Sequence, residues 1–427
     1  GLMTTIKDLV LTVAGNATLS RWRPNSELSL VELAEQVLSA KGYDQTRGLA
    51  AAFWEAYAGS DADAKQQFFS HLTQNLDLDP RRASSALQSY TELPDAERYH
   101  TLVQTIEAPR RDLFRRLNQT KEGTRCLVEL RADLLKAVKK DITLKRADID
   151  LKSLLTAWFN LGVLELRPLN WGSPAEILEK IIRYEAVHQI DNWRALRQRM
   201  EPPDRRCFGY FHPAMPDEPL IFVQVALGTE IPIAIGDVLA EDREICAQDR
   251  ATVATFYSIS NCQSGLAGIS FGNFLIKQVV KFLQVEFEAL ETFVTLSPIP
   301  GLSKWMESAS ADAKDVFIDV PINQIAAYYL SEMKGSDGQP DDPVARFHLG
   351  NGARIHAVHE DADLSEKGQQ QSQGAMVNYL YDLKDISKNY EDYTSKTRVA
   401  RSKAITQLAN LAGQKFAKHI QSKQLTA

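Results

Sequence analysis

The sequence predicts an all-helical bundle followed by a mixed α/β domain, with the boundary near residue 155 of 427. Before that point, apolar residues recur at spacings of three and four, as in Leu127, Leu130 and Leu134, which places them on one face of a helix. From about Trp158, β-branched and aromatic runs bounded by turn residues alternate with helical stretches. A chain of this length can form two domains that each bury a core. We therefore predict a helical domain over 1–155 and a mixed-sheet domain over 156–427.

Capping and turn residues mark the helix ends of the first domain. Ser29, with Glu32 three residues later, has the pattern of a capping box, and the helix that follows is expected to stop near Gly42. Turn or proline signals predict further helix breaks at Gly59–Asp63, Asp79–Pro80, Leu93–Pro94 and Ala108–Pro109. The first domain is therefore expected to be a bundle of several short helices.

The second domain is predicted to contain a hairpin and a crossover. Cys207–Phe211 and Leu220–Ala226 have the composition of two strands joined by a turn. Three elements are predicted after them: a strand at Thr252–Ile259, a helix at Phe274–Phe287 and a strand at Phe293–Leu296. The remaining segments are expected to be an alternating strand region at Arg346–Val358, a polar loop at Gln369–Gln373 and one helix from about Thr394 to Gln421. The crossovers are long enough for parallel pairing.

Composition excludes several classes of function. The formal net charge is −6, and acidic residues are spread along the chain, so the basic footprint of a nucleic-acid-binding protein is absent. No apolar run approaches the roughly 20 residues of a membrane span, and the N-terminal region lacks the profile of a secretory signal. The four cysteines contain no C-x-x-C pair, which argues against a zinc ribbon and for a reducing compartment: Cys126, Cys207, Cys246 and Cys262. We expect a cytoplasmic protein that binds neither nucleic acid nor a membrane.

A metal site near the C-terminal half is disfavoured. His356, His359, Glu360 and Asp361 are close together in the sequence, but strand residues three apart face opposite sides of a sheet, so the two histidines would not easily converge on one ion. We therefore expect no metal.

The segment FYSISNCQSGLAGISFGNFLIKQVV, at 256–280, has the order strand, glycine-containing loop, helix. Glycines allow backbone N–H groups to turn toward an anion, and the start of the following helix adds electrostatic attraction. No Gly-Lys-Ser/Thr follows, and the glycine spacing is not that of a dinucleotide fingerprint. The spacing of Gln263 and Gly268 resembles the pyrophosphate loop of the GNAT acetyltransferase fold, which binds coenzyme A. The alternative is that the glycines only end a strand and allow a helix to pack closely.

Three shorter motifs carry candidate reactive groups. Ser297 precedes Pro298-Ile299-Pro300-Gly301, whose prolines would hold the serine hydroxyl on a rigid turn as a hydrogen-bond donor. His348 precedes a glycine-rich turn and is a residue type that can exchange a proton near pH 7. Tyr379 and Tyr381 would share one face of a strand and could orient a ligand. The alternatives are an ordinary turn, a structural histidine and aromatic core packing.

Together these segments resemble the malonyl-CoA decarboxylase family. The resemblance runs from Asn170-Trp171 through the FYSIS strand, the GLAG loop, the FLIK helix, the LSPIPG turn, the FHLGNGA turn and the NYLY segment, in matching order and spacing. Trp171-Gly172-Ser173-Pro174, Glu185-Ala186-Val187-His188 and Phe211-His212-Pro213 fit the family pattern as well. The resemblance thus covers most of the chain after about residue 155, whereas the first part matches mainly in its helical character.

The resemblance implies a GNAT-fold catalytic domain that binds the acyl-CoA, and a helical domain used in the assembly of a dimer or tetramer. It implies that Ser297 and His348 act as a catalytic pair and that Ser258 and Tyr381 line the malonyl pocket. Coenzyme A is part of the substrate, so no cofactor is expected. The substrate-binding loop is expected to comprise Gln263, Gly265, Leu266, Ala267, Gly268, Ile269, Ser270, Phe271, Gly272 and Asn273. Some members of the family carry a glutamate at the position of Ser270, so an acidic group that acts there would have to be replaced in this chain.

The expected reaction is the metal-free conversion of malonyl-CoA to acetyl-CoA and CO2. An enolate forms when CO2 leaves, and His348 is expected to protonate it after Ser297, Ser258 and Tyr381 have oriented the malonyl group. Two other classes remain open: an acyltransferase that passes an acyl group to an amine, and an inactive acyl-CoA sensor.

Overall fold

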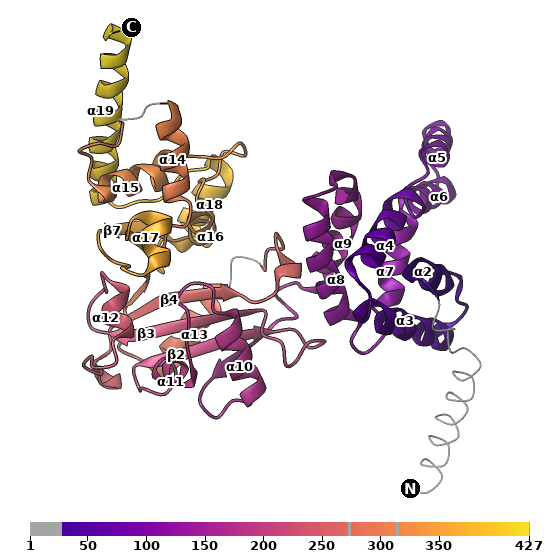
Figure 1. The fold of residues 1–427 in the computed structure, drawn as a ribbon, viewed down its shortest axis with the longest axis horizontal. Helices are drawn as coiled ribbons and strands as arrows, with labels where there is room; N and C mark the ends of the chain where they lie inside the picture. The colour runs from indigo at the N-terminus through magenta and orange to yellow at the C-terminus, as the bar shows by residue number, and fades with distance from the viewer. Residues whose placement is uncertain (1–27, 272–274, 313–315, 427) are drawn as a thin grey trace, which may run out of the picture. The chain divides into compact units, whose positions relative to one another are not determined.

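The computed structural model describes residues 28–271, 275–312 and 316–426, which form two compact units (Figure 1). The first unit contains the chain up to Asn160 together with the segment Gln263–Ser270. The second contains Leu161–Cys262 and the chain from Phe271 onward. In the described residues, no helix is both long enough and apolar enough to cross a membrane.

The first unit is helical, as predicted. Ser29 and Glu32 form the capping box, with both backbone–side-chain hydrogen bonds present, and every predicted break falls between two helices. The helices are α2 Leu30–Ser39, α3 Tyr43–Ala58, α4 Ala62–Gln74, α5 Pro80–Glu92, α6 Ala96–Ile106, α7 Pro109–Leu117, α8 Gly123–Val138 and α9 Lys145–Trp158. Their core includes the aromatic ring of Phe53, which contacts the rings of Trp54 and Phe68.

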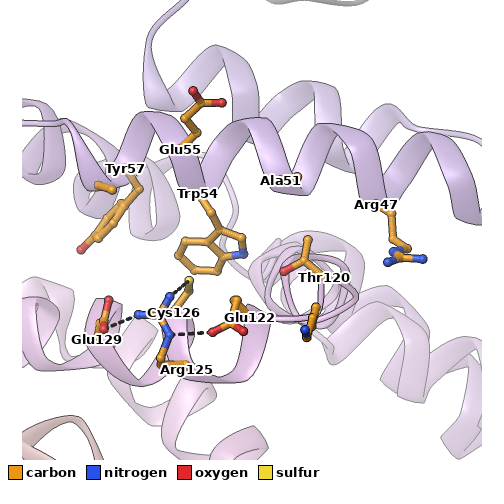
Figure 2. A pocket seen from close by; sticks show the side chains of 12 residues that line it. Arg47, Ala51, Trp54, Glu55, Tyr57, Thr120, Glu122, Arg125, Cys126 and Glu129 are labelled. Carbon is orange, nitrogen blue, oxygen red and sulfur yellow. Dashed lines mark hydrogen bonds and ion pairs between the residues drawn. The ribbon is translucent and has the colours of Figure 1, made fainter. Parts of the chain in front are cut away.

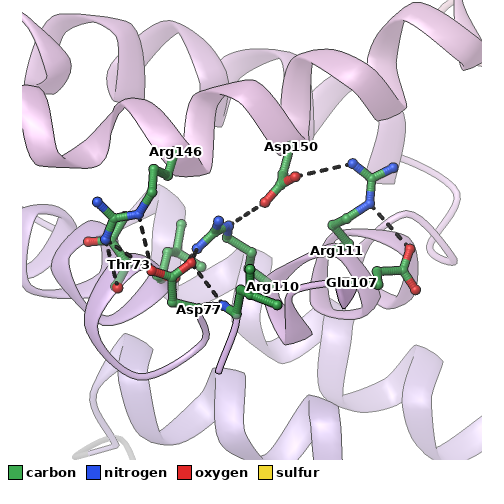
Figure 3. Close-up of polar contacts among 9 residues, drawn as sticks. Thr73, Asp77, Glu107, Arg110, Arg111, Arg146 and Asp150 are labelled. Atoms are coloured by element: carbon green, nitrogen blue, oxygen red, sulfur yellow. Dashed lines mark hydrogen bonds and ion pairs between the residues drawn. The ribbon is translucent and has the colours of Figure 1, made fainter. Parts of the chain in front are cut away.

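A charged network ties α7 to α9 and to the chain after α4 (Figure 3). The buried Arg110 guanidinium pairs with Asp77 at 2.7 Å and with Asp150. Arg146 also pairs with Asp77, and Arg111 with Asp150. A buried guanidinium needs such partners, because an unpaired charge away from water is strongly destabilising.

The second unit is built on one mixed sheet with the order β1-β2-β3-β4-β5-β8-β6, and β7 also pairs with β8. The hairpin of β2 and β3 confirms the prediction. Val253–Phe256 of β4 pair in parallel with Thr292–Thr295 of β5. The other pairings are antiparallel. The strands are β1 Glu165–Leu169, β2 Arg205–Phe211, β3 Ile221–Gly228, β4 Val253–Asn261, β5 Thr292–Thr295, β6 Ser297–Pro298, β7 Arg354–His359 and β8 Met376–Leu380. The predicted class, a helical domain followed by a mixed-sheet domain, is confirmed.

Helices cover both faces of this sheet. The ring of Phe208 on β2 contacts Phe282 of α13, Leu275–Glu286, while Cys207 on the same strand lies in a core with residues of α10, Ala175–Tyr184. This follows from the alternation of side chains along a strand. The other helices are α11 Trp193–Gln198, α12 Ile235–Leu239, α14 Leu302–Asp312, α15 Ile322–Glu332, α16 Pro343–Gly350, α17 Glu366–Ser372, α18 Ile386–Lys396 and α19 Lys403–Thr426.

Three predictions for the C-terminal part are wrong. The region expected to be one alternating segment begins with helix α16 and becomes strand β7 only at Arg354, because the Asp342 side chain caps the helix and Pro343 occupies its first turn. Most of the expected polar loop at Gln369–Gln373 belongs to α17. The expected C-terminal helix is two helices, since Thr397 has a left-handed φ of 51° that ends α18.

Candidate active site

Ser297 and His348 lie together although they are 51 residues apart in the chain. Ser297 begins β6, and His348 occupies the last turn of α16. The distance from Ser297 Oγ to His348 Nε2 is 3.4 Å, which is a long hydrogen bond. Both side chains are buried. The structure thus brings the two predicted catalytic residues into contact.

The His348 ring is held by two tyrosines from the end of β8. Its Nδ1 lies 2.6 Å from the hydroxyl of Tyr381. Its plane stacks on the ring of Tyr379, with 4.7 Å between centroids and 25° between planes. The two tyrosines therefore face the same group, as their alternate spacing predicts. The nitrogen that faces Ser297 is fixed by these contacts.

A second hydroxyl supports Ser297. The Ser297 hydroxyl donates to Thr295 Oγ1 at 2.8 Å, and that oxygen accepts the backbone N–H of Tyr379 at 3.0 Å. The polar groups thus run in one line from Thr295 through Ser297 and His348 to Tyr381. In the described part of the chain, Nδ1 of His348 contacts the Tyr381 phenol rather than a carboxylate.

Burial lowers the pKa of His348 to about 3 from its ordinary value of 6.5, because charging the ring away from water is unfavourable. We expect the imidazole of the free protein to stay neutral between pH 5 and 8, so its NMR resonances, measured with nitrogen-15-labelled histidine, should not titrate in that range. His348 stabilises the fold fully above about pH 6.5, and this contribution is lost as the pH falls. A resonance of His348 with a midpoint near 6.5 would contradict the buried environment.

Asp342 joins the segment after Ser297 to the helix that carries His348. One carboxylate oxygen accepts the backbone N–H groups of Val344 and Ala345 at the start of α16, and the other accepts that of Gly301 at 3.1 Å. The side chain is only 1% exposed. Burial raises the pKa of Asp342 to about 6, so the group is ionised at pH 7. Sequence reasoning missed this residue, although an aspartate before a proline is a helix-start signal.

Ser258 does not join the Ser297–His348 pair. Its hydroxyl donates to the Glu185 carboxylate at 2.8 Å, and the same carboxylate accepts from Gln224 at 2.7 Å. A register shift in the pairing of β3 and β4 makes Gln224 the partner of Ser258 and Val225 the partner of Phe256. Consecutive residues on β3 face opposite sides, and partners share a face. Ser258 therefore faces away from the side of Phe256, whose ring contacts Tyr381.

The predicted substrate-binding loop is described as far as Phe271, and Gly272 and Asn273 lie outside the described residues. Leu266, Ile269 and Phe271 are buried, whereas Ala267, Gly268 and Ser270 are exposed. The apolar side chains thus fix the loop and the small residues face solvent. Gln263 is half-buried at its start.

The glycines of this loop serve different purposes. A Cβ on Gly265 would lie 1.8 Å from the carbonyl oxygen of Val128 in α8, so this glycine allows close packing. Gly268 has a φ of +75°, which side-chain-bearing residues rarely adopt. Close packing thus requires a glycine at 265, and the turn requires one at 268.

The first unit also contains a cavity of about 510 Å³ lined mainly by α3 and α8 (Figure 2). Trp54, Arg47 and Cys126 line it, and Arg125 in its wall pairs with Glu122 and Glu129. Burial raises the pKa of the Cys126 thiol to about 11. The thiolate is the reactive form of cysteine, so Cys126 is not an activated nucleophile at pH 7.

Comparison with known proteins gives matches along most of the chain. The family model for the malonyl-CoA decarboxylase C-terminal domain matches residues 162–319 and 312–419, and the model for the N-terminal domain of that family matches residues 77–159. The mitochondrial malonyl-CoA decarboxylase of Mus musculus is 32% identical over 420 residues, which cover 84% of this chain and 85% of the mouse protein. The protein of the same name from Anser anser anser is 32% identical over 414 residues, covering 83% and 82%.

Two solved structures are similar over almost their whole length. The crystal structure of malonyl-CoA decarboxylase from Rhodopseudomonas palustris has a TM-score of 0.84 and 42% identity, and the alignment covers 88% of this chain and 99% of that one. The corresponding structure from Agrobacterium vitis has a TM-score of 0.82 and 40% identity, with 89% and 99% covered.

Proposed function

Since this chain belongs to the malonyl-CoA decarboxylase family, we propose that it converts malonyl-CoA to acetyl-CoA and CO2 through an enolate that His348 protonates. The observation that carries the mechanism is the contact between the Ser297 hydroxyl and the His348 ring. A buried hydroxyl and a buried imidazole at one point can orient a small acyl group and exchange a proton with it.

The reaction requires geometry and charge stabilisation. When the bond between the α-carbon and the carboxylate breaks, its electron pair moves into the thioester carbonyl and gives an enolate, and CO2 leaves. The enzyme must hold the carboxylate roughly perpendicular to the carbonyl plane and must stabilise the developing oxyanion. The thioester carbonyl itself accepts the electrons, so the chemistry requires neither a metal nor an organic cofactor.

Ser297 is proposed to orient the malonyl group, and His348 to supply the proton. A Tyr381 hydroxyl that donates to Nδ1 leaves the proton of the neutral imidazole on Nε2, the nitrogen that faces Ser297. The carboxylate of the substrate brings a negative charge near this ring, which favours its protonated form. In each turnover the protonated ring transfers its Nε2 proton to the α-carbon and becomes neutral, and a proton from solvent restores the protonated form.

That Ser258 lines the malonyl pocket stays a prediction. Its hydroxyl is bound to Glu185, so we assign orientation of the acyl group to Ser297 and Tyr381. The glycine loop at 263–273 is proposed to bind the nucleotide end of coenzyme A. The exposed backbone at Ala267 and Gly268 supports this role, because it can approach a phosphate without a side chain in the way.

The reaction can be tested with malonyl-CoA as the only substrate, in the presence of a chelator. Mass spectrometry is expected to find acetyl-CoA and release of CO2 without an added acceptor. Transfer of an acyl group only when an amine is supplied would identify an acyltransferase. Tight binding with no product would identify an acyl-CoA sensor.

Assembly and location are separate proposals. We propose a homo-oligomer, dimer or tetramer, on the family resemblance of the helical domain. A cytoplasmic location stays a prediction from composition, and the relatives from mouse and goose are named as mitochondrial proteins.

A further inference from the structure

The exposed turn at Gly268 lies beside a lysine of helix α9, outside the glycine loop itself. The Lys152 amine is 3.3 Å from the point where a Cβ on Gly268 would lie. We propose that Lys152 binds a phosphate group of coenzyme A at this turn. This inference rests on the proposed function, because it assumes that the ligand of the loop is an acyl-CoA. Lys152 belongs to helix α9 and is not part of the glycine-loop motif, so the motif alone does not predict this ligand.

Arg131 of α8 holds the loop through hydrogen bonds to the loop backbone. Its guanidinium pairs with the fully buried Asp148 at 2.9 Å and donates to the carbonyl oxygens of Gly265 and Ala267, both at 2.8 Å. Arg131 is itself only 2% exposed. Its charge is balanced by Asp148, so its remaining donors hold the loop carbonyls in one orientation. Arg131 is thus a positioning residue for the turn.

The turn directs an N–H group away from Arg131. Ala267 has φ −54° and ψ 134°, Gly268 has φ +75°, and the N–H of Ile269 donates to the Leu266 carbonyl at 3.0 Å. These values define a type II turn, in which glycine is favoured at the third position. In a planar trans peptide, the C=O and N–H groups point in opposite directions. Because Arg131 binds the Ala267 carbonyl, the Gly268 N–H points the other way.

The Lys152 amine is free to bind an anion. In the part of the chain that the structure describes, neither the Gly268 N–H nor the Lys152 amine has a hydrogen-bond partner. Asp148 lies one helical turn before Lys152, but its oxygens are occupied by Arg131 and by Lys145 at 2.6 Å. Lys152 is therefore not neutralised by its helical neighbour.

The local charge also fits a phosphate. Arg131 and Lys145 both pair with Asp148, so Lys152 adds a positive charge that this carboxylate does not balance, in a chain with a net charge of −6. An ammonium group and a backbone N–H at a glycine are the donors that phosphates bind in proteins. The alternative is that Lys152 is an ordinary solvated lysine that binds no ligand.

The test compares Lys152→Ala with Lys140→Ala, which removes the same charge from an exposed site of the same unit. Loss of one charge-assisted contact is expected to raise the KM for malonyl-CoA and the Kd for coenzyme A about tenfold or more. The kcat should change little, because the group binds the nucleotide rather than the acyl end. Lys152→Arg should retain most of the affinity. Calorimetry with coenzyme A gives the Kd directly.

Malonyl-pantetheine, which lacks the nucleotide phosphates, separates a phosphate contact from a structural effect. With this substrate, Lys152→Ala and the unmodified protein should have equal kcat/KM. Equal Kd values for coenzyme A in the Lys152→Ala and Lys140→Ala variants, or an equal loss with malonyl-pantetheine, would overturn the phosphate site. If the unmodified protein makes no acetyl-CoA but its Kd for coenzyme A still depends on Lys152, the proposed reaction fails and the binding site stands.

Discussion

Replacing His348 with alanine is expected to lower kcat by about a hundredfold or more, the usual loss when a positioned donor is removed from a reacting centre. The affinity for coenzyme A should stay the same, because the glycine loop and not the imidazole is proposed to bind the nucleotide. The reason is structural: His348 Nε2 faces Ser297 at 3.4 Å, and its other nitrogen is bound to Tyr381. Acetyl-CoA release measures kcat, and calorimetry with coenzyme A measures the affinity.

His100→Ala is the matched control, since His100 is exposed on α6 and its loss should leave turnover unchanged. His348→Gln fills more of the space left by the buried ring, so a loss of turnover in both His348 variants would not come from a packing defect alone. Thermal unfolding of all three variants reports whether the fold is kept. Normal turnover in a folded His348→Ala protein would remove histidine from the mechanism.

Replacing Asp342 with asparagine is expected to lower the free energy of unfolding by about 2–4 kcal/mol, the cost of disturbing a buried, hydrogen-bonded charge. The carboxylate accepts from Val344, Ala345 and Gly301, and an amide would place a donor against at least one of these N–H groups. The same change loosens α16 relative to the segment after Ser297. We therefore expect kcat to fall more than the affinity for coenzyme A. Denaturant unfolding and steady-state kinetics measure the two effects.

Asp341→Asn provides the control for Asp342. Asp341 is exposed and accepts a hydrogen bond from the Tyr329 hydroxyl, which an amide oxygen can still accept. This variant should keep both stability and turnover close to those of the unmodified protein. Equal stability of the Asp341→Asn and Asp342→Asn variants would show that the buried carboxylate does not connect the two segments.

Local chemistry made most elements of the fold predictable. The Ser29 and Glu32 side chains cap their own helix, and prolines such as Pro80 and Pro109 start helices at the predicted breaks. These effects act within a few residues, so the sequence alone predicts them. The start of α16 at Asp342 and Pro343 uses the same chemistry and was missed because the alternation of later residues suggested a strand. The break at Thr397 has no glycine or proline signal.

The same distinction between local sequence signals and long-range contacts applies to the candidate site. Motifs in the sequence alone name Ser297, His348 and Tyr381 as reactive groups and the loop at 263–273 as a phosphate loop. Only the tertiary structure decides which groups meet, because Ser297 with His348 and Arg131 with Gly265 are contacts between residues 51 and 134 positions apart. It also decides that Ser258 turns to Glu185, since a single register shift between β3 and β4 changes the face of every residue beyond it. Hydrogen-bonding partners and side-chain faces depend on neighbouring elements, which local residue patterns do not specify.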